Sequence, residues 1–218
     1  MIDVNSSIFV TGTDTGVGKT RVAVQLLRQA AAAGRRVAAV KPVAAGAQRG
    51  PDGWRNDDAL ALAAASPVSL PYELLNPCCL PLASSPHLAA AGAGVRIDIP
   101  GLVNAYRLIA AQADAVVVEG AGGWLVPLDD TRTMADLAVA LQLPVLLVVG
   151  VRLGCINHAL LTAAAIRASG LPLSGWVANR IEPSFAGDQH YLQALRERLP
   201  EPCWGELPWA PDSAGGVC

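Results

Sequence analysis

The feature that most constrains the fold is a glycine-rich segment, residues 12–20 (GTDTGVGKT), which follows a short apolar run and opens an Ala- and Leu-rich stretch. Gly16 and Gly18 let the backbone curl so that its amide groups turn inward. A helix beginning at Lys19 adds free N–H groups and a partial positive charge, and the lysine side chain can reach the outer phosphates. Strand, loop and helix in this order predict a phosphate-binding loop, in which the Thr20 hydroxyl can hold magnesium.

The segment departs from the strict phosphate-loop pattern at one position. The pattern GxxxxGK[ST] has glycine where this chain has Thr13, and the glycine lies one place earlier, at Gly12. The alternative interpretation is a glycine-rich turn between a strand and a helix that contains an incidental lysine. The agreement between motif and context favours the phosphate loop.

Short β-branched runs alternate with Ala- and Leu-rich stretches along the chain. This pattern predicts strands over residues 8–11, 36–43, 115–119, 145–149 and 173–178, and helices over residues 19–33, 57–65, 99–112, 134–141, 158–169 and 189–199. Apolar strands separated by helices indicate an α/β fold with a mostly parallel central sheet and helices on both faces, like that of P-loop NTPases. We expect a single domain over residues 1–218, with ligands beyond the carboxyl ends of the strands. A mobile polar loop is expected over residues 46–53, and irregular, proline-rich structure over residues 66–100.

The composition excludes several classes of protein. Hydrophobic residues make up 52% of the 218 residues and charged residues 16%, which suits a buried core and disfavours disorder. The net charge is −2 and no basic stripe is present, so we expect no nucleic-acid partner. The strongest apolar run, residues 144–151, is too short to span a membrane, and the first residues do not resemble a signal peptide. Five cysteines without metal-type spacing indicate reduced thiols and a cytoplasmic location.

A second lysine and two acidic residues fall at or after the ends of predicted strands. Lys41 ends an apolar strand, where it points either to an anion such as a γ-phosphate or to solvent, and the sequence leaves both open. Glu119 follows three valines, at a position where many P-loop proteins place a magnesium contact, although a capping or turn carboxylate is the alternative. Asp58 is a further candidate ligand, or simply a first-turn residue of a helix capped by Asn56.

These side chains together predict phosphoryl transfer. Oxygen atoms of Thr20, Asp58 and Glu119 suit magnesium. Lys19 and Lys41 supply positive charge where negative charge develops in the reaction. The residues themselves predict this class of reaction but not the substrate.

Several short segments add specificity through their joint order and spacing. They are VTGTDTGVGKT (10–20), KPVAAG (41–46), NDDALAL (56–62), SPH (85–87), VEGAGGW (118–124), VVGVRLGCINH (148–158), GWVAN (175–179) and GELPW (205–209). In these segments the chain resembles the dethiobiotin synthase family of P-loop enzymes along nearly its whole length. The LGCINH and VEGAGGW segments distinguish this family from other P-loop proteins.

The resemblance implies a reaction. Members of the family convert 7,8-diaminopelargonate, carbon dioxide and ATP into dethiobiotin, ADP and phosphate, a step of biotin biosynthesis. One amine of the substrate takes up carbon dioxide as a carbamate, which attacks the γ-phosphate to give a carbamic-phosphoric anhydride. The second amine then closes the urea ring and expels phosphate. Two lysines and magnesium would offset the repulsion between the carbamate and the γ-phosphate.

The resemblance also assigns roles residue by residue. The implied ATP-binding positions are Gly16, Val17, Gly18, Lys19, Thr20, Arg21, Asp58, Glu119, Gly120, Ala121, Gly122, Asn179, Arg180, Pro208, Trp209 and Ala210. The implied substrate-binding positions are Thr13, Lys41, Ala45, Leu153, Gly154, Cys155, Asn157 and Tyr191. Of these, the implied catalytic residues are Lys41, Lys19 and Thr13, the implied magnesium ligands are Thr20, Asp58 and Glu119, and the implied reader of adenine is Asn179.

The turn at residues 153–158 opens a helix, and in the family it binds the substrate carboxylate across a dimer interface through helix-end amides. The resemblance therefore implies a homodimer with shared sites. By their own chemistry, Cys155 and His158 are expected to serve as helix-start packing and as a surface imidazole.

Two positions depart from the family pattern. Many members have glutamate where this chain has Gly16, and a serine that contacts substrate falls at Ala45. Loss of that hydroxyl is expected to weaken substrate binding by about one hydrogen bond, ~0.5–1.5 kcal/mol. The role of the segment at residues 85–87 is left open.

Two other functions remain as alternatives. The first is an amidotransferase synthetase acting on a corrin carboxylate, which normally carries a glutaminase domain, and a chain ending at Cys218 is expected to leave no room for one. The second is a nucleotide-driven switch of the partitioning-ATPase type. Such proteins usually carry an extra lysine early in the phosphate loop, where this chain has Thr13, Asp14 and Thr15.

Overall fold

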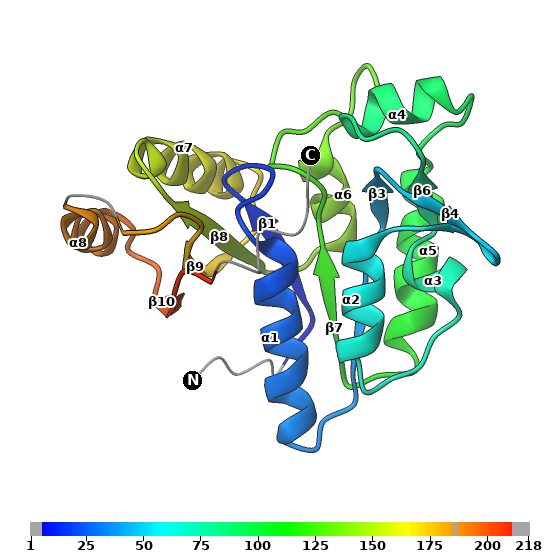
Figure 1. Ribbon diagram of the computed structural model, residues 1–218, viewed down its shortest axis with the longest axis horizontal. Coiled ribbons are helices and arrows are strands. Elements are labelled where there is room, and N and C mark those ends of the chain that lie inside the picture. Colours follow the sequence, from blue (N-terminus) through cyan, green and yellow to red (C-terminus); the bar gives the residue numbers. More distant parts are fainter. Residues whose placement is uncertain (1–5, 185–186, 211–218) are drawn as a thin grey trace.

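The centre of the protein is a parallel β-sheet of six strands. They are β1 (Ile8–Gly12), β2 (Val37–Val40), β7 (Ala115–Glu119), β8 (Val145–Val151), β9 (Leu173–Arg180) and β10 (Cys203–Leu207). The computed structural model, which describes residues 6–184 and 187–210, arranges them in the order β10-β9-β8-β1-β7-β2 (Figure 1). Every neighbouring pair in this order is parallel, which confirms the predicted class of sheet.

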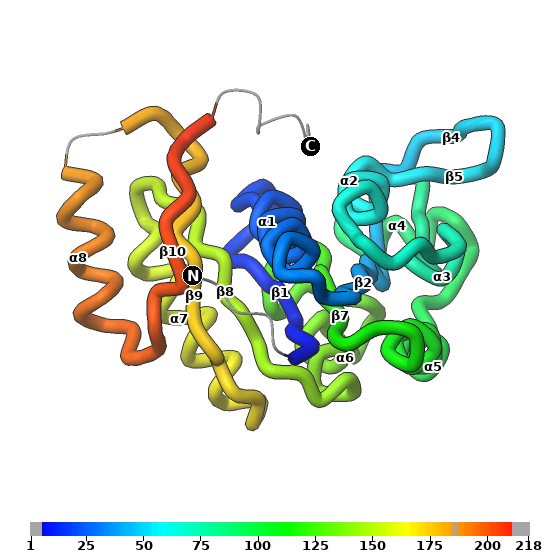
Figure 2. Tube along the Cα trace, turned by 90° about the horizontal axis from the view of Figure 1, so that it is seen from below, coloured from blue at the N-terminus to red at the C-terminus, as the bar shows by residue number. Residues whose placement is uncertain are grey.

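Helices cover both faces of this sheet, as predicted. They are α1 (Lys19–Ala32), α2 (Asp57–Ala65), α3 (Tyr72–Leu75), α4 (Pro86–Gly92), α5 (Ile99–Ala110), α6 (Met134–Leu141), α7 (Cys155–Ala168) and α8 (Asp188–Arg198). Figure 2 shows α1 and α2 on one side of the strands and α5, α6 and α7 on the other. One apolar core joins α1 and α2 to the sheet through Leu26 and Leu62, and a second core on the opposite face includes Leu102 and Leu137.

Local sequence chemistry accounts for several helix starts. The side chain of Asn56 accepts a hydrogen bond from the Ala59 amide and caps α2, as predicted. Thr133 and Asp136 form a capping box at the start of α6. The strands β1, β7 and β8 are buried along their whole length, as expected for parallel strands covered on both faces.

The prediction of one strand over residues 36–43 was wrong at its end. The strand β2 stops at Val40, and β3 (Val43–Ala45) pairs with β6 (Cys78–Leu80) in a separate two-stranded sheet. Proline at position 42 has no N–H for a ladder, and the Lys41 amide donates to the Leu75 carbonyl, 2.8 Å away, instead of to a sheet partner. This break places Lys41 between the two sheets.

Several other boundaries differ from the predictions. The expected loop at residues 46–53 contains most of an antiparallel hairpin, β4 (Gln48–Gly50) and β5 (Gly53–Arg55), which projects from the body of the protein (Figure 2). The segment at residues 66–100, expected to be irregular, holds α3, β6 and α4. The strand β10 was not predicted, and α7 begins at Cys155 instead of His158. Among the described residues, the free thiols are Cys78, Cys79, Cys155 and Cys203. Cys218 lies outside the described residues.

Within the described part of the chain, no helix has the length and apolar character needed to cross a membrane.

Candidate functional site

The glycine-rich loop joins the end of β1 to α1. The Thr13 amide donates to the Val148 carbonyl, 3.0 Å away, which anchors the loop to β8. Gly18 has a φ of +88°, and a Cβ at this position would lie 2.1 Å from the Asn179 amide nitrogen. A Cβ on Gly12 would lie 2.6 Å from a Val17 methyl group, so the displaced glycine of the motif has a packing reason.

Lys19 lies at the start of α1 and is only 7% exposed. Its Nζ donates to the Asp14 carbonyl oxygen, 3.0 Å away, across the mouth of the loop. Burial lowers the pKa of Lys19 to about 8, and the positive charge of Lys41 acts in the same direction. The loop therefore holds a buried ammonium whose charged form a bound anion would stabilise.

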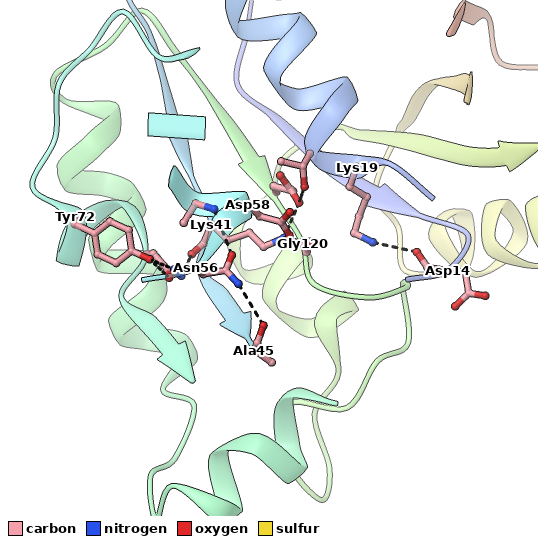
Figure 3. A network of polar contacts seen from close by, with 12 residues as sticks. Asp14, Lys19, Lys41, Ala45, Asn56, Asp58, Tyr72 and Gly120 are labelled. Carbon is pink, nitrogen blue, oxygen red and sulfur yellow. Dashed lines mark hydrogen bonds and ion pairs between the residues drawn. The ribbon is translucent and has the colours of Figure 1, made fainter. Parts of the chain in front are cut away.

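Lys41 is the centre of a buried polar cluster (Figure 3). Its Nζ lies 2.6 Å from Glu119 Oε1 and 3.0 Å from Asp58 Oδ2, and it donates to the Gly120 carbonyl at 3.3 Å. The Thr20 hydroxyl donates to the same Glu119 oxygen at 2.8 Å. Lys41 is 3% exposed, so the alternative of a solvent-facing lysine at a strand end is wrong.

Burial and mutual charge interactions shift the pKa values of the ionisable groups in this cluster. Burial opposes the ammonium of Lys41, but the two carboxylates outweigh burial and raise its pKa. Burial raises the pKa of Glu119. Asp58 is less buried, and although burial opposes ionisation, Lys41 lowers its pKa. The second oxygen of Glu119, Oε2, is buried without a hydrogen-bond partner among the described residues.

Both lysines of the sequence lie at this site. Lys19 and Lys41 are the two lysines of the sequence, and the remaining basic residues apart from histidine are arginines. The described residues contain no group of three or more His, Cys, Asp or Glu side chains that could hold a metal ion. A cation bound between Asp58 and Glu119 would therefore draw on Thr20 and on ligand oxygens as well.

A second set of predicted residues gathers beside the first turn of α1. Arg21 donates to Asn179 Oδ1 at 2.8 Å and to the Pro208 carbonyl at 2.7 Å. The Asn179 Nδ2 donates to the Val17 carbonyl at 2.9 Å, so this side chain braces the glycine-rich loop from the end of β9. Each end of the Asn179 amide keeps capacity for one more hydrogen bond.

The other residues predicted to contact the nucleotide lie on three segments: after β10, at the end of β9 and in the loop after β7. Trp209 is 40% exposed and Ala210 is partly buried, just beyond the end of β10. Arg180 forms an ion pair with Asp188 at the start of α8. Ala121 and Gly122 follow Gly120 in the loop after β7.

The predicted substrate turn lies at the start of α7, two strands away from β7 in the sheet. Leu153 is 78% exposed, whereas the Cys155 side chain is buried, as expected of helix-start packing. Arg152 pairs with Asp14 at 2.7 Å and ties this turn to the phosphate loop. Asn157 follows in the first turn of α7, and Tyr191 lies on α8 and packs against the core.

The substrate positions are thus divided. Lys41 lies in the break between β2 and β3, and Ala45 ends β3. Thr13 lines a cleft of about 360 Å³ between the phosphate loop and α7. The cleft lining consists of Thr13, Asp14, Thr15, residues 123–127, Leu161, Thr162 and Ala165. The predicted residues at the start of α7 and on α8 do not line this cleft.

Sequence reasoning missed two polar residues beside the cluster. Asn76 donates to the Lys41 carbonyl at 2.6 Å, and the Tyr72 hydroxyl accepts from the Asn56 amide at 2.8 Å. No motif points to them, because their partners lie far along the chain. The Ser85 hydroxyl lies 3.0 Å from the His87 Nδ1 at the start of α4, and the His87 amide donates to the carbonyl of Pro127, a residue of the cleft lining, at 3.3 Å.

Comparisons with known proteins agree with this geometry. A family model described as an AAA domain matches residues 6–215. The chain is 53% identical over 207 residues to the ATP-dependent dethiobiotin synthetase BioD of Xanthomonas oryzae pv. oryzae (strain PXO99A), covering 95% of this chain and 92% of that protein. It is 51% identical over 206 residues to the protein of the same name from Xylella fastidiosa (strain 9a5c), covering 94% and 91%.

Solved structures show the same fold at low sequence identity. The MinD cell division protein of Aquifex aeolicus aligns with a TM-score of 0.59 at 17% identity, over 96% of this chain and 86% of that chain. A ParA family ATPase from Chlorobium tepidum TLS aligns with a TM-score of 0.58 at 15% identity, over 96% and 87%. These likenesses concern the fold alone. Identity above one half to the dethiobiotin synthetases, over nearly the whole length of both chains, shows that this chain belongs to the dethiobiotin synthetase family of P-loop proteins.

Proposed function

We propose that this protein forms dethiobiotin from 7,8-diaminopelargonate, carbon dioxide and ATP. The observation that carries the proposal is the buried cluster around Lys41 and Glu119 beside a phosphate loop, in a chain so similar to dethiobiotin synthetases. The substrate carbamate forms a bond from its oxygen to the γ-phosphorus as the bond to ADP breaks. The free amine then bonds to the carbamate carbon, phosphate leaves, and the nitrogen protons pass to solvent.

The two lysines provide the charge that this reaction needs. The carbamate and the γ-phosphate are both anions, so bringing them together is costly without nearby positive charge. Lys19 faces the mouth of the phosphate loop, and Lys41 lies on the far side of the same site. We assign Lys19 to the outer phosphates, Lys41 to the transferred group and Thr13 to the substrate side of the loop.

Magnesium suits the oxygen atoms at the site. Thr20, Asp58 and Glu119 would hold the ion together with phosphate oxygens and water, because magnesium prefers oxygen ligands and usually retains several waters. The Glu119 Oε2 atom is buried and has no hydrogen-bond donor among the described residues, and a bound cation would satisfy it. This supports the assignment. The bound ion neutralises charge that builds on the phosphates. Glu119 and Asp58 also pair with the Lys41 ammonium, so the same carboxylates would serve both the ion and the lysine.

The nucleotide base is assigned to the far side of α1. The amide of Asn179 keeps one free donor and one free acceptor site, the pair that the edge of adenine requires. Arg180, Pro208, Trp209 and Ala210 would surround the base. Gly120, Ala121 and Gly122 would contact nucleotide or substrate from the loop after β7.

We further propose that two copies of this chain form a homodimer, with the substrate carboxylate bound by the helix-start turn of one copy. Leu153 and Leu161 on this side of the protein are 78% and 62% exposed, and Leu125 in the neighbouring loop is 63% exposed. Such exposed apolar side chains favour an interface between subunits. We place the protein in the cytoplasm, acting on small molecules without nucleic acid or membrane.

Labelled bicarbonate tests the proposed reaction directly. Purified protein is incubated with ATP, magnesium, 7,8-diaminopelargonate and [13C]bicarbonate, and products are followed by mass spectrometry. Dethiobiotin carrying the label in its ureido carbon is expected. ATP hydrolysis without any product of the diamine would contradict the proposal and favour the switch-type ATPase.

A further inference from the structure

The three segments that carry Lys41, Ala45 and Asp58 are joined by hydrogen bonds from side chains that the proposed reaction does not use. Lys41 follows β2, Ala45 ends β3, and Asp58 lies in the first turn of α2. Hydrogen bonds between the segments hold them in place relative to one another. Tyr72 and Asn76, which begin and follow the short helix α3, supply the connections.

The Tyr72 hydroxyl is the centre of this network. It accepts a hydrogen bond from the Asn56 backbone N–H at 2.8 Å, at the cap of the helix that carries Asp58. It donates to Asn76 Oδ1 at 3.1 Å. Burial raises the pKa of Tyr72 to about 12, so the phenol keeps its proton and remains a donor. Figure 3 shows Tyr72 and Asn56 on one side of Lys41 and Asp58, with Lys19 on the other.

Asn76 extends the network to Lys41. It is 2% exposed, and its Nδ2 donates to the Lys41 carbonyl at 2.6 Å, while the Lys41 amide donates to the Leu75 carbonyl at 2.8 Å. Both backbone polar groups of Lys41 are therefore held by α3 and its end. This matters because the chain leaves the sheet at this residue and has no ladder partner there.

Asn56 completes the network on the substrate side. Its Oδ1 accepts from the Ala59 amide and caps α2, and its Nδ2 donates to the Ala45 carbonyl at 3.3 Å. Arg55, the preceding residue, lies over the Tyr72 ring with its guanidinium carbon 4.1 Å from the ring centre. The tyrosine ring is thus held separately from its hydroxyl, which lets the two contributions be tested one at a time.

We propose that Tyr72 and Asn76 are positioning residues that set the placement of Lys41 relative to Asp58 for phosphoryl transfer. The proposal rests on the roles proposed above for Lys41 and Asp58 in dethiobiotin formation. The physical reason is that catalysis by placed charges is sensitive to shifts of the order of 1 Å, whereas ATP binding depends mainly on the phosphate loop. The hydrogen bonds of Tyr72 and Asn76 run to the Asn56 amide, to each other and to the Lys41 carbonyl, not to the phosphate loop, so turnover and nucleotide binding should separate.

Substitution Tyr72→Phe removes the hydroxyl and keeps the ring under Arg55. We expect kcat for dethiobiotin formation to fall about tenfold, with the Kd of ATP and the KM of the diamine changed less than about twofold. Substitution Asn76→Ala should give a similar loss by releasing the Lys41 carbonyl. Because the two act through one network, the double variant should lose about as much as one single variant, not the product of both.

Substitution Tyr106→Phe is the matched control, since Tyr106 lies on α5, packs against the core and is not one of the hydrogen-bond partners of Tyr72, Asn76 or Asn56. It should leave kcat unchanged. Wild-type kcat in Tyr72→Phe would overturn the positioning role, as would parallel losses of ATP affinity and turnover, which indicate general loosening of the fold. Failure of the wild-type protein to form dethiobiotin would instead overturn the proposed function, so the two failures are distinguishable.

Discussion

The ammonium of Lys41 lies 2.6 Å from a carboxylate oxygen of Glu119, and both side chains are almost fully buried. Removing one partner of such a pair leaves the other charge buried without compensation. The pair is joined to the phosphate loop by the Thr20 hydroxyl, which donates to the same carboxylate oxygen. The chemistry of the site and its stability are therefore connected through one oxygen atom.

Substitution Lys41→Ala tests the role of this ammonium. We expect turnover to fall by a hundredfold or more, about the loss seen when one charge-stabilising group is removed from an active site. ATP binding should remain measurable, because the glycine-rich loop and Lys19 are intact. Steady-state turnover and calorimetric ATP binding on the same preparation separate the two effects. Unchanged turnover would show that Lys41 takes no part in the reaction.

The buried Lys19 predicts a pH dependence of ATP binding. Its pKa is lowered to about 8 by burial and by Lys41, so the free protein loses this charge as the pH rises through that value. ATP binds the protonated form, and its affinity should be constant below the pKa and fall by up to about tenfold per pH unit above it.

The sequence allows a direct measurement of that pKa. Because Lys19 and Lys41 are the two lysines, protein labelled with 13C at lysine Cε gives two lysine signals, and Lys19→Met assigns them. One signal should titrate near pH 8 and the other well above it. Two signals that both titrate above the ordinary lysine pKa of about 10.4 would contradict the account.

Two glycines of the phosphate loop provide a matched pair of variants. Gly18→Ala places a Cβ 2.1 Å from the Asn179 amide nitrogen, whereas Gly16→Ala meets nothing within 4 Å. Both have positive φ, so each substitution should destabilise folding by about 1 kcal/mol. Only Gly18→Ala should also displace Asn179 and weaken ATP binding, by about tenfold or more. Equal ATP affinities for the two variants would argue against the contact between the loop and Asn179.

The exposed Leu161 on α7 tests the proposed homodimer. Substitution Leu161→Asp should shift the protein from dimer to monomer in sedimentation velocity and abolish dethiobiotin formation, while ATP still binds. Leu108→Asp on α5 is the control, because Leu108 is similarly exposed, at 52% against 62%, on another helix. A wild-type protein that sediments as a monomer would remove the basis for a shared site.

Much of the fold could be predicted because its signals are local. The valine run before Glu119, the glycines around Lys19 and the Asn56 cap each act over a few residues, and the structure places them as predicted. The roles predicted for the two lysines and the carboxylates rest on residue types that suit phosphates and magnesium, and these roles stay predictions.

The remainder depends on contacts between distant parts of the chain. The burial of Lys41 is decided by Glu119 and by the end of α3, neither of which is near it in sequence. The strand β10 forms because residues 203–207 find an open edge beside β9, not because their own pattern is strong. Tyr72 and Asn76 look like ordinary polar residues of a proline-rich segment until the segment is folded.

Phosphate release from ATP tests the central claim most directly. Purified protein is assayed with and without 7,8-diaminopelargonate plus bicarbonate, while dethiobiotin is followed by mass. The account predicts that phosphate release requires both substrates and that dethiobiotin appears in equal amount. Phosphate release that is indifferent to the diamine would contradict it.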